Sequence, residues 1–281
     1  MKRRNVETSK RQNVETSKCP PHIRPRFATS AFTMIELLVV MGVLTLLVSI
    51  LLPSLSAARR QAQAVTCRSN IRQIIMANDY YRDDHDGVYV PGASDFLDNL
   101  NRWHGERDSV NLAFDSTRGP LVPSLGPDGA IRACPSFEPD AIDFEAGNGG
   151  YGYNNAYIGV QIVGSGPGRA MVTTDQAGAY SDRVKRPGET IMFTDSAFAG
   201  KTLIEYSFAE PRFQLQFPTY RTDPSIHFRH DGLANVGWCD GHVDAHVMTF
   251  THHSGSYRSD PKSFDIGWFG EVDDNSLFDL D

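Results

Sequence analysis

The sequence predicts an α+β protein in which one long N-terminal helix packs, through its second half, on a small antiparallel β-sheet of a globular domain. Three observations support this fold class. Residues 37–52 are 16 consecutive uncharged residues, residues 54–86 contain neither Gly nor Pro, and from Gly87 onward short apolar runs alternate with Asp-Gly pairs. Long uninterrupted stretches with one apolar stripe are typical of helices, and short runs between turn residues are typical of strands.

Charge divides the chain into a basic leader and an acidic remainder. Residues 1–31 carry eight basic and two acidic side chains, a net charge of +6, whereas residues 32–281 carry 19 basic and 32 acidic side chains, a net charge of −13. Phosphate backbones are bound through clustered Lys and Arg side chains. The acidic remainder therefore argues against a nucleic-acid partner.

The apolar run is the membrane-spanning candidate. Extended back to Phe32 it has 21 residues. That is ~31 Å of helix at ~1.5 Å per residue, which matches a hydrocarbon core of ~30 Å. We expect residues 32–53 to be the transmembrane half of the helix, with a carboxylate, Glu36, near one end of the span, where an ionisable group is costly and usually has a partner.

Three interpretations of this segment remain open. A secretory signal peptide would be removed at the small residues 54–57, and a signal anchor would keep the basic leader in the cytoplasm. In the third interpretation, cleavage between Ala31 and Phe32 removes the leader and leaves an apolar helix that begins with an ammonium group. When such helices stack, Glu36 of one helix can neutralise the amine of its neighbour, so the pair offsets the desolvation of both charges.

Residues 31–36, Ala-Phe-Thr-Met-Ile-Glu, stand directly before the apolar run and resemble the processing site of type IV prepilins and type II secretion pseudopilins. In that family a prepilin peptidase cuts before the Phe and methylates the new amine. The resemblance implies that Ala31, in place of the family's usual Gly, is the last residue of the removed leader 1–31. It also implies that Phe32 becomes N-methylated and that Glu36 sets the register of assembly.

Residues 54–86 are expected to form the amphipathic half of the helix, which would run from Phe32 to about Asp84. Apolar residues recur there at steps of three or four, which indicates one buried stripe. The stripe consists of Ala64, Cys67, Ile71, Ile74, Ile75 and Tyr81. Pro53 removes one backbone hydrogen bond, so we expect a helix kink at this residue. A Pro just past the apolar half also resembles the pilin helix.

Residues 87–281 are expected to form one β-rich globular domain. Five apolar runs predict strands: Val88–Val90, Tyr157–Val163, Thr190–Phe193, Asn235–Cys239 and His242–Val247. The last two runs predict a hairpin with a two-residue Asp240-Gly241 loop in positive φ.

His230, nine further residues and then Asp240-Gly241 match the H-x9-DG signature of a large prepilin-type family. Five other strings also resemble that family: 67–73, 84–87, 134–136, 151–154 and 187–195. The resemblance implies a pilin-like fold and a pseudopilin or pilin-like structural subunit of a type II secretion or type IV pilus-like assembly. Its partners would be the prepilin peptidase, copies of the chain, other pseudopilins, and an inner-membrane assembly platform with its ATPase.

This interpretation places the chain in the inner (cytoplasmic) membrane as a single-pass protein, with the globular domain exported to the periplasm or the cell surface. The alternative is a membrane-anchored exported binding module that does not polymerise. The two hypotheses differ in what they require of Glu36, which the first needs for assembly and the second does not.

The residues with metal-ligand or catalytic chemistry gather near the C-terminus, where the types suit zinc. They are His227, His230, Cys239, Asp240, His242, His246, His252 and His253. At ~3.3 Å per residue a straight strand would hold His230 and Asp240 more than ~20 Å apart, so the signature need not be one site. We predict that the chain binds no metal and no cofactor and is not an enzyme. We expect these side chains to have structural roles.

Three cysteines lie C-terminal to the proposed cleavage site: Cys67, Cys134 and Cys239. If the globular domain is exported, they are in an oxidising compartment, where disulfides persist. A disulfide between Cys67 and Cys134 is our first choice, which would leave Cys239 as a buried thiol beside Trp238. Other pairings remain open from the sequence.

Overall fold

The computed structural model describes residues 32–281 except 95–97, 127–128, 130, 142, 167–168, 175–176 and 254–258. The predicted leader 1–31, with Ala31, lies outside the described residues. The chain divides into two compact units, residues 1–51 and residues 52–281.

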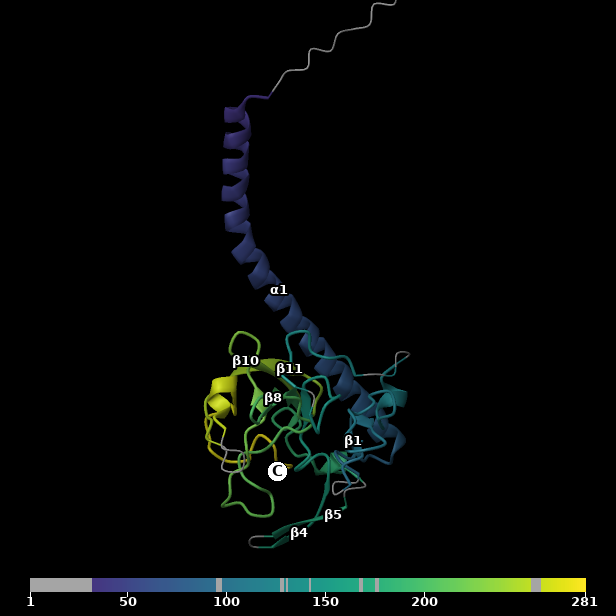
Figure 1. Cartoon of the computed structure of the whole chain (residues 1–281). Coiled ribbons are helices and arrows are strands. Elements are labelled where there is room, and N and C mark those ends of the chain that lie inside the picture. The colour runs from purple at the N-terminus through teal and green to yellow at the C-terminus, as the bar shows by residue number, and fades with distance from the viewer. Residues whose placement is uncertain are drawn as a thin grey trace, which may run out of the picture. The chain divides into compact units, whose positions relative to one another are not determined.

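The long predicted helix is present as α1, Met34–Asp84, which continues through Pro53 (Figure 1). The expected kink at Pro53 stays a prediction, because that residue lies at the junction of the two units. In the first unit the apolar side chains from Phe32 to Leu51 are exposed. By length and composition, α1 is the helix among the described residues that could cross a membrane.

The second half of α1 buries one face against the globular unit. The buried residues are Cys67, Asn70, Ile71, Ile74, Ile75, Ala77 and Asn78. The predicted stripe is therefore confirmed in its centre, whereas Ala64 and Tyr81 at its ends are half-buried. The stripe also contains two asparagines, whose amides donate to tyrosine hydroxyls: Asn70 to Tyr151 at 3.0 Å and Asn78 to Tyr153 at 3.1 Å.

The central sheet has the strand order β11-β10-β6-β3 and is antiparallel throughout. Its strands are β3 (Tyr151–Tyr153), β6 (Ile191–Asp195), β10 (Leu233–Trp238) and β11 (Val243–Val247). Successive side chains of a strand point to opposite faces. In β10, Gly237 accordingly lies under Ile71 and Ile75 of α1. Ala234, Val236 and Trp238 face a second core that contains Trp268 and Phe269.

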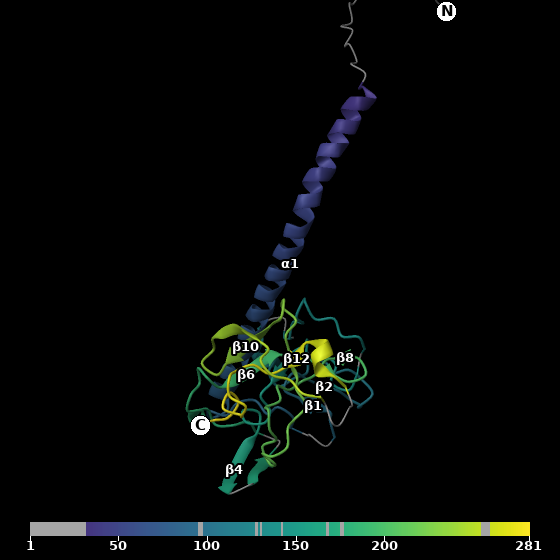
Figure 2. The same ribbon diagram turned by 90° about the vertical axis from the view of Figure 1, so that its left-hand side faces the viewer.

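Four two-stranded antiparallel ribbons complete the described strands. They are β1 (Asn101–Arg102) with β2 (Gly105–Glu106), β4 (Gln161–Gly166) with β5 (Arg169–Thr174), β7 (Phe198–Ala199) with β8 (Leu203–Ile204), and β9 (Ile226–His227) with β12 (Ile266–Gly267). Short 3₁₀ helices η1 (Val122–Ser124), η2 (Ser181–Arg183) and η3 (Pro261–Phe264) lie between them. Figure 2 shows β4 at the lower edge of the globular unit, away from β6 and β10.

Two of the five strand predictions need correction. Val88–Val90 is not a strand, because Val88 makes one isolated bridge to Tyr180. Tyr157–Val163 is a strand in its last part alone, since β4 begins at Gln161. The preceding residues turn back instead: the N–H groups of Ile158 and Gly159 donate to the carbonyl of Asn154. Their apolar character reflects burial in the core.

The predicted β10–β11 hairpin is confirmed, but its loop differs from the prediction. Trp238 N–H donates to His242 O and Gly241 N–H donates to Trp238 O, each at 3.0 Å, so the loop has three residues. Of the Asp240-Gly241 pair, Gly241 has positive φ (+91°). A turn closed by a left-handed glycine is a common three-residue hairpin loop. The two-residue loop in which both residues have positive φ occurs at Asp231-Gly232, with φ of 54° and 83°.

Candidate functional site

Four of the strings that resemble the H-x9-DG family each contribute one side chain to the same buried cluster. Cys67 comes from α1, Cys134 from the loop before β3, Asp195 from the end of β6, and His230 from the residue before the Asp231-Gly232 loop. One sulfur, nitrogen or oxygen atom from each lies within 4.8 Å of the others, and all four residues are buried. Sequence positions 67 to 230 therefore meet at one point in the globular unit.

Cys67 and Cys134 are joined in a disulfide bond, the pairing that was the first choice from the sequence. Their Cα atoms are 5.1 Å apart and 67 positions separate them in the chain. The loop side of the bond is fixed by Cys134 N–H, which donates to Gly149 O at 2.9 Å. The bond ties the second half of α1 to the loop that leads into the central sheet.

Asp195 is the charged centre of the cluster. Its Oδ1 lies 3.3 Å from Nη2 of Arg229, and its Oδ2 lies 3.1 Å from Nε2 of His230. The backbone N–H of Asn235 also donates to Oδ2 at 2.8 Å. Burial alone would raise the pKa of Asp195, but Arg229, His230 and this N–H outweigh it and hold the pKa below its ordinary value. The carboxylate is thus ionised and fully paired.

His230 connects this carboxylate to the disulfide. Its Nε2 lies 3.7 Å from Sγ of Cys134 as well as next to Asp195, while its Nδ1 is buried without a hydrogen-bond partner among the described residues. The Asp231-Gly232 loop positions the ring, because it pairs His230 with Leu233 through two backbone hydrogen bonds of 3.0 and 3.1 Å. That loop depends on Gly232, since most side chains rarely adopt its φ.

The two ends of the H-x9-DG signature do not form one site. His230 lies in the cluster, three residues before β10 begins, whereas Asp240 and Gly241 lie in the loop at the opposite end of that strand. Asp240 is exposed, and its Oδ1 lies 2.6 Å from Nδ1 of His242. This agrees with the expectation from strand length that the two ends of the signature need not form one site.

Among the described residues, no other histidine of the C-terminal region contributes a ligand atom to the cluster. Burial, followed by the charge of Arg229, lowers the pKa of His227 to about 3. His246 Nε2 lies 3.0 Å from Asp244 Oδ1 on β11. Cys239 is a buried free thiol, and burial raises its pKa. The side chains that suggest zinc chemistry in the sequence include His230 but not the other three clustered residues, although the family-like strings at 67–73, 134–136 and 187–195 contain those three.

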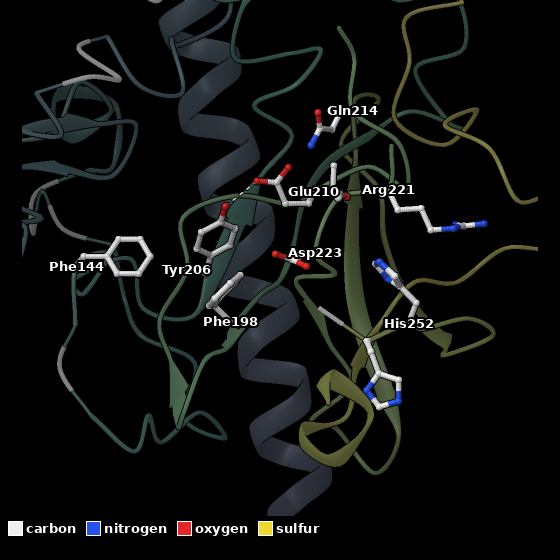
Figure 3. Close-up of a pocket in the computed structure, with 10 residues that line it drawn as sticks. Phe144, Phe198, Tyr206, Glu210, Gln214, Arg221, Asp223 and His252 are labelled. Atoms are coloured by element: carbon white, nitrogen blue, oxygen red, sulfur yellow. Dashed lines mark hydrogen bonds between the residues drawn. The ribbon is translucent and has the colours of Figure 1, made fainter. Parts of the chain in front are cut away.

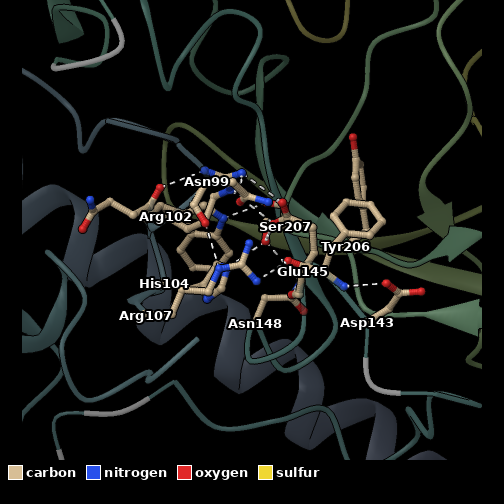
Figure 4. Close-up of polar contacts among 12 residues, drawn as sticks. Asn99, Arg102, His104, Arg107, Asp143, Glu145, Asn148, Tyr206 and Ser207 are labelled. Atoms are coloured by element: carbon tan, nitrogen blue, oxygen red, sulfur yellow. Dashed lines mark hydrogen bonds and ion pairs between the residues drawn. The ribbon is translucent and has the colours of Figure 1, made fainter. Parts of the chain in front are cut away.

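A second buried polar group surrounds Glu145 (Figure 4). Arg102 pairs with its Oε1 at 3.0 Å, Ser207 Oγ donates to its Oε2, and His104 Nε2 lies 2.7 Å from Ser207 Oγ. A nucleophilic serine would pass its proton to the histidine. Here Ser207 donates to the carboxylate, and burial with the charges of Arg102 and Arg107 lowers the pKa of His104 to about 3. These contacts connect β1 to the segments that carry Glu145 and Ser207, and they were not predicted from the sequence.

An open cavity of the globular unit has a volume of about 640 Å³ and an aromatic and acidic lining. It is lined by Phe144, Phe198, Tyr206, Glu210, Gln214, Arg221, Thr222, Asp223, His252 and His253. In Figure 3 the three aromatic rings lie on one side of the cavity and the carboxylates of Glu210 and Asp223 lie between them and His252. Burial raises the pKa of Glu210, whose Oε1 accepts from the Tyr206 hydroxyl at 2.7 Å. This lining suits a small ligand with hydroxyl or amine donors.

Comparisons of the chain with protein-family models, with curated proteins and with solved structures find no match. Function is therefore inferred from the sequence patterns and from the geometry described above.

Proposed function

We propose that the chain is a pseudopilin-like or pilin-like structural subunit of a type II secretion or type IV pilus-like assembly. In this proposal a prepilin peptidase removes residues 1–31 and methylates the new amine of Phe32. The observation that carries the proposal is Glu36, a carboxylate in the first turn of a helix whose apolar side chains are exposed over the following turns. A charge in such a position calls for a partner.

The Glu36 carboxylate has a hydrogen-bonding partner at the N-terminal end of its own helix, Thr33. Thr33 N–H and Thr33 Oγ1 both lie 2.8 Å from Oε2 of Glu36, while Glu36 N–H donates to Thr33 Oγ1 at 3.2 Å. This reciprocal arrangement is a capping box, which stabilises a helix N-terminus. Glu36 thus has two candidate roles: it caps its own helix, and in the proposed filament its charge pairs with the amine of a neighbouring subunit.

The two roles can be separated because a capping box accepts Gln as well as Glu. Glu36→Gln keeps the side-chain carbonyl for Thr33 N–H but removes the charge. We expect this variant to enter the membrane normally and to fail in assembly, measured by cross-linking of subunits in membranes. Thr33→Val is the matched control, because it removes the hydroxyl contacts and keeps the charge. Normal assembly of Glu36→Gln would contradict the proposal.

The mature N-terminus gives an independent test. Mass spectrometry of the membrane-extracted protein is expected to find a chain that begins with N-methylated Phe32. A chain that retains Met1 would point to a signal anchor, and a chain that begins near Ala57 would point to a signal peptide; either result would overturn the proposal.

We further propose that the apolar half of α1 resides in the inner (cytoplasmic) membrane and that the globular unit lies in the periplasm or at the cell surface. The Cys67–Cys134 disulfide supports an exported domain, because such bonds persist in oxidising compartments. Other pseudopilins, an assembly platform and its ATPase would be the partners.

A membrane-anchored binding module is the second candidate function, and the aromatic and acidic cavity favours it. A neutral disaccharide could stack on the rings and donate hydroxyls to Glu210 and Asp223. Calorimetric titration of the protein with maltose, cellobiose and chitobiose tests this, with Asp223→Asn expected to abolish any heat of binding. If the protein binds one of these sugars, and the Glu36→Gln variant binds it as well as the unsubstituted protein does, the result would favour a binding module over a filament subunit.

A further inference from the structure

We propose that Cys67, Cys134, His230 and Asp195 form a four-ligand Zn²⁺ site when the disulfide between the two cysteines is reduced. Thiolate, imidazole and carboxylate are the ligands that zinc prefers, and structural zinc sites take four of them. The inference does not depend on the proposed filament function, because it concerns the interior of the globular unit alone.

The ligand atoms are already gathered. One donor atom from each residue lies within 4.8 Å of the other three, and Nε2 of His230 stands 3.7 Å from Sγ of Cys134 and 3.1 Å from Oδ2 of Asp195. Each residue comes from a different segment of the globular unit, so the folded chain holds them in place before any ion enters. Small shifts would bring the four atoms to the ~2.0–2.3 Å that zinc requires.

The disulfide alone does not explain why Asp195 and His230 are buried beside it. Two cysteines suffice for the bond, yet the chain also buries Asp195 completely and leaves 3% of the His230 side chain exposed. Burying a charge and an imidazole is unfavourable unless they are paired, and within the described part of the chain Nδ1 of His230 has no hydrogen-bond partner. A metal site gives these polar groups a function, because their geometry is then required when the sulfur–sulfur bond is open.

The charges of the site would balance with the ion present. Two thiolates and the Asp195 carboxylate carry three negative charges, and Zn²⁺ with the Arg229 guanidinium carries three positive charges. With the disulfide closed, Asp195 and Arg229 balance each other. With a neutral His230 ring, the charges that are counted here cancel in both states, which favours a buried site.

The chemistry of the change is also balanced. A dithiol reductant supplies two electrons and two protons, so that the sulfur–sulfur bond breaks, two thiols form and the reductant becomes a disulfide. Zn²⁺ then binds and displaces one proton from each thiol. The proton between His230 and Asp195 moves to the vacant Nδ1, which frees the Nε2 lone pair for the metal.

A surface cavity adjoins the cluster. A cavity of about 260 Å³ is lined by residues that include Gln63, Pro135, Glu138, Arg229 and His230. His230 belongs both to this cavity and to the cluster, so reductant and ion would approach the sulfurs from this side.

The test uses the full chain in detergent, purified oxidised and then reduced with a non-thiol phosphine in the presence of one equivalent of Co²⁺ or Zn²⁺. Reduced protein is expected to bind one ion per chain, with an intense thiolate-to-Co²⁺ absorption band, and oxidised protein is expected to bind none. His230→Gln and Asp195→Asn are each expected to weaken Zn²⁺ affinity by more than ~100-fold, beyond the ~10–100-fold typical of residues that only support a ligand.

The oxidised form provides the folding control for each variant, because its near-ultraviolet circular dichroism is recorded before reduction. Cys239→Ala is the matched control, since that thiol is buried but lies outside the cluster, and it is expected to leave metal binding unchanged. Three results would each overturn the inference: no ion bound by reduced, folded protein; equal affinity in His230→Gln; or unfolding on reduction that added Zn²⁺ does not prevent.

Discussion

Gly237 of β10 leaves no space for a side chain beneath Ile75 of α1, because a Cβ atom at Gly237 would lie 2.5 Å from Cδ1 of Ile75. Ile71, one helical turn earlier, would approach the same atom to 2.6 Å. Both isoleucines are fully buried. The glycine therefore sets how closely the helix approaches the sheet.

Replacement of Gly237 by Ala is expected to lower the free energy of unfolding by ~1–3 kcal/mol, since extra atoms in a packed core force its side chains to move. Urea denaturation followed by circular dichroism measures the change. Gly200→Ala is the matched control, because a Cβ there meets one atom at 3.6 Å. Adding Ile75→Val to Gly237→Ala is expected to restore part of the loss; stability equal to wild type in Gly237→Ala alone would refute the close contact.

Loss of the disulfide is expected to cost ~4 kcal/mol of folding free energy, by the loop-entropy estimate for a closed segment of 67 residues. Cys67→Ser, Cys134→Ser and the double variant should be destabilised alike under metal-free, non-reducing conditions, because each removes the same bond. Chemical denaturation of the three variants checks this. Additive effects of the single variants would show that the bond is absent from the purified protein.

Two buried histidines predict acid sensitivity. The pKa values of His104 and His227 are lowered from 6.5 to about 3, chiefly by burial, so the folded protein keeps both rings neutral. Below pH 6.5 the unfolded chain binds protons that the folded chain does not. Stability is therefore fully present above pH 6.5 and falls as the pH decreases toward 3, by ~1.4 kcal/mol per pH unit for each histidine.

The variants His104→Gln and His227→Gln should each remove part of that slope. Urea unfolding at a series of pH values measures it, and the constant packing cost of each substitution is read above pH 7.5. An unchanged slope between pH 6.5 and 4 would mean that the ring in question is accessible to protons in the folded protein.

Asn78 joins the helix to the sheet through a closed set of hydrogen bonds. Its Oδ1 accepts from Val90 N–H at 2.9 Å, its Nδ2 donates to Tyr153 OH, and that hydroxyl donates to Val90 O at 3.0 Å. Asn78→Ala leaves buried groups unpaired, so we expect a loss of ~1–3 kcal/mol. Gln73→Ala, at an exposed position of the same helix, should change stability little. Equal effects of the two substitutions in urea unfolding would contradict this role.

The sequence predicts the elements whose signal is local. The helix followed from the absence of Gly and Pro and from the spacing of Ile71, Ile74 and Ile75, and the β10–β11 hairpin followed from alternating apolar residues around a turn. The strand prediction for Tyr157–Val163 was wrong in its first part, because an apolar run bounded by turns does not distinguish a buried strand from a buried turn. The predicted length of the loop at Asp240-Gly241 was wrong, because an Asp-Gly pair also fits a three-residue hairpin loop.

The candidate site was harder to predict, because its members lie between 67 and 230 in the chain and meet through tertiary packing. The number and positions of the cysteines were enough to suggest the Cys67–Cys134 disulfide as the first choice. Nothing local to Asp195 indicated that it would lie beside His230, since that contact depends on β6 pairing with β10 and on the turn at Asp231-Gly232. Buried ionic groups at strand ends carry little local sequence signal.

The position of the Cys67–Cys134 bond has a mechanical consequence. Along α1 from its N-terminal end, Cys67 is the first fully buried residue, ahead of Asn70 and Ile71. Tension applied to the preceding part of the helix therefore reaches a covalent link before it reaches the buried hydrogen bonds and apolar contacts. The load passes through the sulfurs into the loop before β3, so peeling the helix from the sheet would first require a chemical bond to break.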